Sequence, residues 1–234
     1  MKKGKLYLLP TILSENSKDS SIPIIVNTHI DKINIFFVEN IRTSRRYIKN
    51  ISYNKDIDNI LFYSFGKHDS IDMNKDFLPH ILKGKDIGLL SEAGLPCIAD
   101  PGSKIVEYAH NMQVDVIPLV GPSSIFLSLM ASGMNGQNFT FNGYLPINNK
   151  ERIRALRNIE ILSKKYNTTQ IFIETPYRNN KLLNTILKTC NKKTRLCIAS
   201  NISSPLEYIK TKNISEWKEE KINLHKIPTI FLIG

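Results

Sequence analysis

The stretch LLSEAGLPCIADPGSKIVEYA, Leu89 to Ala109, is an apolar run that breaks into a loop and then continues as a helix-like segment. The loop carries two acids, two glycines and two prolines. Glycine lets a backbone approach a ligand closely, and proline stiffens its path. If the apolar run is a central parallel strand, the loop lies at its carboxyl end, where open α/β sheets bind ligands. An ordinary strand-to-helix connection would use the same residues.

Other short apolar runs flank this stretch in the first half of the chain. Continuous runs of branched and aromatic residues are typical of strands covered on both faces. Helix-like segments separate the runs, and this alternation predicts a parallel sheet wrapped by helices. The expected strands are Lys5–Pro10, Ile33–Glu39, Ile60–Phe65, Asp86–Ser91 and Val114–Val120.

The pattern changes in the second half of the chain. Near the carboxyl end, strand-like segments follow one another without a long helix between them. Such strands pair antiparallel or at an edge, which predicts a mixed sheet. We therefore expect two α/β domains, residues 1–119 with a mainly parallel sheet and residues 120–234 with a mixed sheet. The expected boundary lies near Leu119–Pro122.

Composition narrows the class of protein. The 234 residues are 41% hydrophobic, enough for a sizeable core, and the net charge is +11. A basic balance suits contact with nucleic acid, although a solvated lysine-rich surface gives the same charge. We find no membrane-spanning run, and the apolar segment before Pro10 is too short for a signal peptide, so we expect a cytoplasmic protein. Cys97, Cys190 and Cys197 lack metal-site or disulfide spacing, so we expect no metal.

Common catalytic and phosphate-binding motifs are missing from the sequence. We find neither GxGxxG nor GxxxxGK[ST], and neither GxSxG nor HExxH. Two further glycine–proline loops follow strand-like runs, at 121–124 and 143–146. Each loop alone is compatible with a simple turn. Loops of this kind in both halves favour a cleft between two domains.

Three motifs occur in a recognisable order: SEAGLPCIADPG (91–102), VIPLVGPSSIFLSLMASG (116–133), and FTFNGYLP (139–146) followed by KERIRAL (150–156). Together they resemble the tetrapyrrole methylase superfamily of S-adenosylmethionine-dependent methyltransferases. The most similar branch is that of the small-subunit ribosomal RNA cytidine 2'-O-methyltransferases. The segments IFIETPYRNNKLL (171–183) and IPTIFLIG (227–234) also resemble that branch, so the likeness covers nearly the whole chain.

The resemblance implies two α/β domains with S-adenosylmethionine in the cleft between them, usually in a homodimer. It implies methyl transfer to a cytidine ribose 2'-hydroxyl in ribosomal RNA of the small subunit. A small ligand with an amine, a carboxylate and a purine suits backbone amides and apolar walls. The implied cofactor residues are Ala93, Gly94, Ile98 and Ala99 at the methionine and ribose end, Ser123 and Ser124 at the linker, and Leu145, Pro228 and Thr229 at the adenine side.

The chain departs from the family pattern in two places. The first strand of the family runs into a glycine-containing loop resembling ATPIGN, and an acidic EDTR segment follows later. This chain has LPTILSE (9–15) and VENIRTSRRY (38–47), which keep Glu39 and Arg42 but lose the glycine. The chain is also shorter than the family at its carboxyl end. Both differences fall where substrate specificity is expected, so the resemblance supports methyl transfer more strongly than any one acceptor.

Methyl transfer to a hydroxyl needs an aligned acceptor and a group that takes one proton. Carboxylates that follow strand-like runs are candidates for that base, with a surface or ion-paired role as the alternative: Glu39, Glu92 and Glu174. Basic residues at helical spacing are candidates for contacts to RNA phosphates, with a solvated helix face as the alternative: Arg42, Arg45, Arg46 and Lys49.

Two other functions remain open from the sequence. A methyltransferase of a tetrapyrrole or other small molecule would share the cofactor loops and have an apolar acceptor pocket. A non-catalytic relative that binds ribosomes would have lost the cofactor, in line with the changed first loop.

Overall fold

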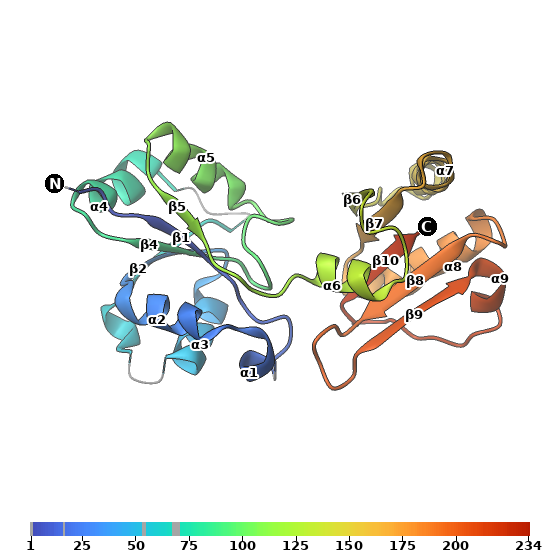
Figure 1. Ribbon diagram of the computed structural model, residues 1–234, viewed down its shortest axis with the longest axis horizontal. Helices are drawn as coiled ribbons and strands as arrows, with labels where there is room; N and C mark the ends of the chain where they lie inside the picture. The colour runs from blue at the N-terminus through green and yellow to red at the C-terminus, as the bar shows by residue number, and fades with distance from the viewer. Residues whose placement is uncertain (1, 16, 53–54, 67–70) are drawn as a thin grey trace. The chain divides into compact units, whose positions relative to one another are not determined.

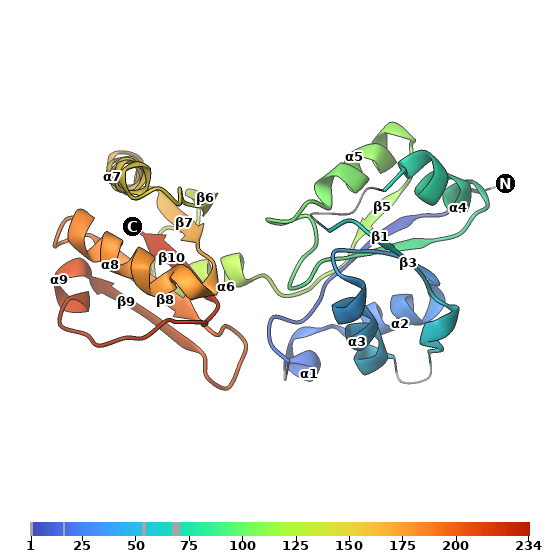
Figure 2. The ribbon, with the colours of Figure 1, turned by 180° about the vertical axis from the view of Figure 1, so that it is seen from behind.

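A computed structural model of the chain describes residues 2–15, 17–52, 55–66 and 71–234. The chain folds as two compact units, Met1–Ser123 and Ser124–Gly234. Figure 1 gives the elements of each unit, and Figure 2 shows them from behind. Among the helices of the described residues, none is long and apolar enough to cross a membrane.

The first unit holds a five-stranded sheet in the order β3-β2-β4-β1-β5, and every described pair in it is parallel. Its central strands β2 and β4 are buried along their whole length, as the continuous apolar runs predict. The predicted parallel sheet is confirmed. The strands are β1 (Leu6–Leu9), β2 (Ile35–Val38), β3 (Leu61–Ser64), β4 (Ile87–Leu90) and β5 (Val116–Pro118).

Helices cover both faces of this sheet (Figure 1). Phe36 packs with α2 and α3 on one face, and Phe37 packs with α4 and α5 on the other, because successive strand residues point to opposite faces. These helices are α2 (Ile24–Lys32), α3 (Ile41–Ile51), α4 (Leu78–Leu82) and α5 (Ser103–Asn111). Shorter helical turns are α1 (Lys18–Ser21), η1 (Ile57–Asn59) and η2 (Met73–Phe77).

The connections from β1 and β4 leave the sheet on opposite faces. The chain passes from β1 to α2 on one face, and from β4 to α5 on the other. β1 and β4 are neighbours in the sheet. Open α/β sheets form a ligand crevice where the connections of neighbouring strands diverge in this way. The topology therefore predicts a ligand site at the loops that follow β1 and β4.

The second unit holds a five-stranded sheet in the order β6-β7-β10-β8-β9. The β6–β7 pair is parallel and the other pairs are antiparallel, so the predicted mixed sheet is confirmed. The strands are β6 (Phe139–Tyr144), β7 (Thr169–Ile173), β8 (Arg195–Ser200), β9 (Tyr208–Asn213) and β10 (Thr229–Ile233). The helices are α6 (Ser124–Ala131), α7 (Asn149–Tyr166), η3 (Pro176–Arg178), α8 (Asn179–Thr189) and α9 (Ile214–Trp217).

One apolar cluster holds the second unit together. Residues of α7, α8 and α9 pack against β7, β8 and β10. The rings of Phe172 and Phe231 stack with centroids 5.9 Å apart. The buried indole of Trp217 donates to the Leu196 carbonyl at 2.8 Å, which satisfies its polar nitrogen inside the core.

Candidate active site

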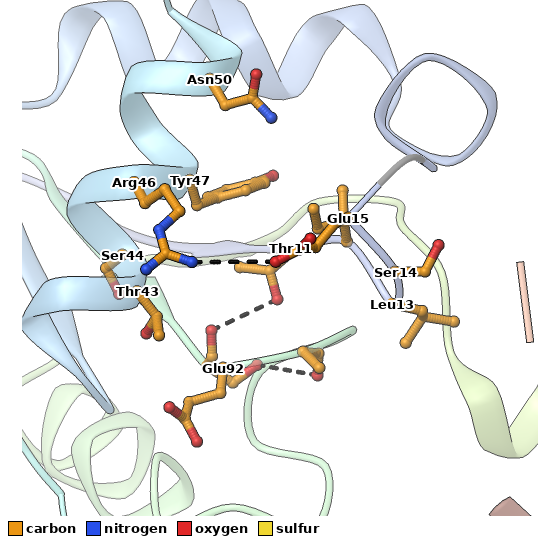
Figure 3. Close-up of a pocket in the computed structure, with 13 residues that line it drawn as sticks. Thr11, Leu13, Ser14, Glu15, Thr43, Ser44, Arg46, Tyr47, Asn50 and Glu92 are labelled. Atoms are coloured by element: carbon orange, nitrogen blue, oxygen red, sulfur yellow. Dashed lines mark hydrogen bonds and ion pairs between the residues drawn. The ribbon is translucent and has the colours of Figure 1, made fainter. Parts of the chain in front are cut away.

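A cavity of about 460 Å³ lies beside the carboxyl ends of β1 and β4 in the first unit. Its walls come from the loop after β1 (Thr11–Glu15), from helix α3, and from the loop after β4 (Ser91–Ala93). Figure 3 shows these segments around the cavity. The volume is in the range of small-molecule sites, and the position is the one that the sheet topology favours.

Two main-chain hydrogen bonds join the loops after β1 and β4. The Thr11 amide donates to the Gly94 carbonyl at 2.9 Å, and the Gly94 amide donates to the Thr11 carbonyl at 3.2 Å. Gly94 has a φ of +74°, and a Cβ there would lie 3.2 Å from both Leu13 Cδ2 and the Pro122 carbonyl oxygen. The loop therefore needs glycine at this position, because of both its backbone conformation and its close neighbours.

A buried tyrosine fixes helix α3 against the loop after β1. The Tyr47 hydroxyl donates to the Pro10 carbonyl at 2.7 Å. Burial raises the pKa of Tyr47 well above its usual range, so the hydroxyl stays protonated and remains a donor. The helix starts where the Asn40 side chain accepts from the amides of Arg42 and Thr43. The cap and the hydrogen bond together set how α3 faces the cavity.

The three candidate carboxylates lie in different surroundings. Glu92 lines the cavity. Glu39 Oε2 accepts from the Glu92 amide at 3.1 Å, so Glu39 positions the main chain of Glu92. Glu174 lies in the second unit and is 5% exposed. Its Oε1 accepts from Arg178 Nη2 and from the Thr175 amide, both at 2.7 Å. Of the three, Glu92 is the carboxylate at the cavity.

The basic residues of α3 divide into two groups. Arg46 lines the cavity. Arg45 is not part of the cavity wall: its Nη2 lies 2.7 Å from Asp58 Oδ1, and its guanidinium lies 5.8 Å from the ring centre of Phe62. Arg42 and Lys49 are exposed. Consecutive residues of a helix point about 100° apart, and for this reason Arg45 and Arg46 meet different neighbours.

The implied cofactor residues of the first unit lie in the loop after β4, except Ser123, which is the last residue of the unit. Ala93 lines the cavity, Ile98 and Ala99 are exposed, and Ser123 is buried. Asp100 shapes this loop by accepting from the amides of Cys97 and Gly102 at 2.8 and 2.7 Å. Burial raises the pKa of Asp100, and these two amides oppose the rise. Cys97 and Ala99 adopt the left-handed backbone conformation, with φ of 68° and 65°.

The remaining implied cofactor residues belong to the second unit. Ser124 is the first residue of α6. Leu145 is packed in the apolar cluster, and the Thr229 hydroxyl is buried and donates to the Ile227 carbonyl at 2.9 Å. Pro228 is exposed, and its carbonyl accepts from the Asn201 amide at 3.0 Å. The side chains of Leu145 and Thr229 are thus engaged in contacts within the second unit. A ligand at these two residues would contact their main chains.

Several residues of the cavity wall were not expected from the sequence. They include Thr11, Leu13, Glu15, Tyr47 and Asn50. For the loop after β1, the sequence offered one indication of a role in the site, namely its departure from the family pattern. Tyr47 and Asn50 had none, because helical spacing gives no indication of which loop a helix will face.

Comparison with known proteins assigns the family. The chain is 31% identical to ribosomal RNA small subunit methyltransferase I of Buchnera aphidicola subsp. Schizaphis graminum, over 99% of this chain and 78% of that protein. The chain belongs to the ribosomal RNA small subunit methyltransferase I family. The relative with this name in Vibrio cholerae is 28% identical over 97% of this chain and 76% of its own length. No protein-family model matches.

A solved structure supports the fold. The crystal structure of the methyltransferase CobJ matches with a TM-score of 0.66 and 12% identity, over 99% of this chain and 94% of that one. The predicted fold class is confirmed. Membership of the ribosomal RNA branch is confirmed as well, and the family is one of methyltransferases, as predicted.

Proposed function

We propose that this protein transfers a methyl group from S-adenosylmethionine to a cytidine ribose 2'-hydroxyl in ribosomal RNA of the small subunit. The observation that carries the proposal is the similarity, over 99% of the chain, to a relative named ribosomal RNA small subunit methyltransferase I. The cavity at the switch point of the first sheet is the candidate acceptor site. The cytidine and its 2'-oxygen come from the family resemblance of the sequence motifs.

The residues of the first unit fit the proposed cofactor. The loop after β4 presents exposed small or apolar residues at Ala93, Ile98 and Ala99. Gly94 packs its main chain against Leu13 and the Pro122 carbonyl, which holds this loop in place. When bound, S-adenosylmethionine supplies a methyl group on a positively charged sulfur. The residues proposed to hold it are Ala93, Gly94, Ile98, Ala99, Ser123, Ser124, Leu145, Pro228 and Thr229.

We assign the residues around the cavity to two further tasks, proton transfer and positioning of the acceptor. The ribose hydroxyl loses one proton as it accepts the methyl group, and Glu92 on the cavity wall takes that proton. Glu39 holds the Glu92 main chain in place through its carboxylate. The Thr11 bridge and the Tyr47 hydrogen bond fix the other walls, so the acceptor is held in one orientation.

The exposed basic residues of α3 suit an RNA partner. We assign phosphate contacts to Arg42 and Lys49, which are exposed on the helix that carries Arg46 to the cavity. The net charge of +11 favours the same partner. We also propose a cytoplasmic homodimer, as the resemblance implies, in which each chain has the two folding units Met1–Ser123 and Ser124–Gly234.

Labelled S-adenosylmethionine tests the proposal directly. Purified protein should label small subunits that lack the endogenous methyl group, and the RNA should then resist alkaline cleavage at one cytidine. A methylated 2'-oxygen cannot attack the neighbouring phosphate. Label on a base, on a protein or on a tetrapyrrole would contradict the proposed ribose acceptor, while the proposal of methyl transfer would stand. Failure of the cofactor to raise the melting temperature would contradict the cofactor.

A further inference from the structure

Two opposite charges meet on the wall of the cavity from different elements. Arg46 comes from α3, and Glu15 ends the described part of the loop after β1. Arg46 Nη1 lies 4.0 Å from Glu15 Oε1, and Figure 3 shows the two side chains directed at each other. This separation exceeds a direct hydrogen bond, so both groups keep hydrogen-bonding capacity. Exposed ion pairs contribute little to stability, so folding does not explain the position of this pair.

The two groups have opposite hydrogen-bonding character. A carboxylate only accepts hydrogen bonds, and a guanidinium only donates them. Cytosine presents an amino donor beside acceptors, whereas uracil presents a carbonyl acceptor where cytosine has its amino group. Glu15 with Arg46 therefore complements cytosine. Against uracil, the carboxylate of Glu15 would face a carbonyl oxygen, and two acceptors would be opposed.

The pair shares its cavity with the proposed base. Glu92 lines the same cavity, from the loop after β4 (Figure 3). Ala93 of that loop also lines it. A volume of about 460 Å³ is large enough for one nucleoside. A nucleotide whose ribose is near Glu92 and whose base reaches Glu15 and Arg46 would use both walls at once.

We propose that Glu15 and Arg46 select the base of the acceptor nucleotide and favour cytosine over uracil. This inference rests on the proposed function and adds the residues that read the base. Glu15 accepts from the amino group, and Arg46 donates to the ring acceptors. Good paired contacts of this kind discriminate between bases by about tenfold to a hundredfold in kcat/KM.

The test compares small subunits with cytidine or uridine at the modified position, each lacking the methyl group, with labelled S-adenosylmethionine as donor. Wild type should prefer cytidine by at least about tenfold. Glu15→Gln should remove most of that preference, because a glutamine amide can also donate to the uracil carbonyl. The matched control is Glu107→Gln, the same change at an exposed site on α5, on the opposite face of the sheet. The control should keep the wild-type preference.

The outcomes separate the inference from the proposed function. A reduced preference in Glu15→Gln alone, with unchanged heat of cofactor binding, supports the pair as the reader of the base. Equal preference in wild type and Glu15→Gln overturns the inference and leaves the function standing. Equal labelling of the cytidine and uridine particles by wild type also overturns the inference and leaves the proposed methyl transfer standing. No labelling of either particle by wild type overturns the proposed function, and the inference with it.

Discussion

Gly94→Ala should destabilise the first unit and weaken cofactor binding. At φ of +74°, alanine costs about 1–2 kcal/mol in backbone energy. The new Cβ would also lie 3.2 Å from Leu13 Cδ2 and from the Pro122 carbonyl oxygen. The leucine side chain can rotate, but the carbonyl belongs to the main chain, so this crowding adds about 1–3 kcal/mol.

Gly133→Ala is the matched control for this change. Gly133 has a φ of +66°, and a Cβ there meets nothing within 4 Å. The control therefore has a similar backbone cost without the crowding. The difference between the two variants isolates the contacts of Gly94 with Leu13 and Pro122.

Two measurements check the prediction. Thermal unfolding should show a larger loss in Gly94→Ala than in Gly133→Ala, by about 2–4 °C for each extra kcal/mol. Titration with S-adenosylmethionine should show affinity lowered about 5- to 30-fold in Gly94→Ala, because the binding-competent loop is less populated. Equal melting temperatures in the two variants, with wild-type affinity in both, would refute the placement of Gly94 in a crowded cofactor loop.

Other contacts give further expectations. Tyr47→Phe removes a buried hydrogen bond, so urea unfolding should show a loss of about 1–3 kcal/mol. Because burial raises the pKa of Tyr47 above 10.0, wild-type stability should fall as pH rises above that value, and the variant should fall less. Glu92→Gln should slow methyl transfer about 10²- to 10⁴-fold with cofactor affinity unchanged; a wild-type rate would exclude Glu92 as the base. Arg42→Ala with Lys49→Ala should lower the salt slope of RNA binding by about 1.4, and Lys104→Ala on α5 should leave it unchanged.

The buried strands of both sheets could be predicted because burial on both faces is visible in the sequence as a continuous apolar run. The expected strand 33–39 contains the observed β2, Ile35–Val38, which is buried at every residue. Helix α2, Ile24–Lys32, has no comparable signal, since its branched residues favour strands. Packing of Val26 and Ile30 against the sheet outweighs that preference.

The candidate site was predictable only in part, because its contacts join distant segments. The need for glycine at position 94 follows from the loop pattern, but its partner Thr11 lies more than 80 residues away, and no local pattern indicates the pairing. Arg45 and Arg46 are consecutive residues of α3, so the helix directs their side chains about 100° apart. The spacing cannot separate their roles, which depend on Asp58 and Glu15 in other parts of the chain.

The loop after β1 differs from the family pattern, and this difference affects the cavity wall more than the hydrogen bonds between this loop and the loop after β4. Thr11 bridges to Gly94 through its amide and carbonyl, which every residue except proline can provide. The bridge therefore does not depend on the side chains in which LPTILSE differs from the family pattern. Leu13 and Glu15 of that loop instead line the cavity. The sequence departure consequently alters the surface that meets the acceptor, and keeps the main-chain frame that holds the loop after β4 in place.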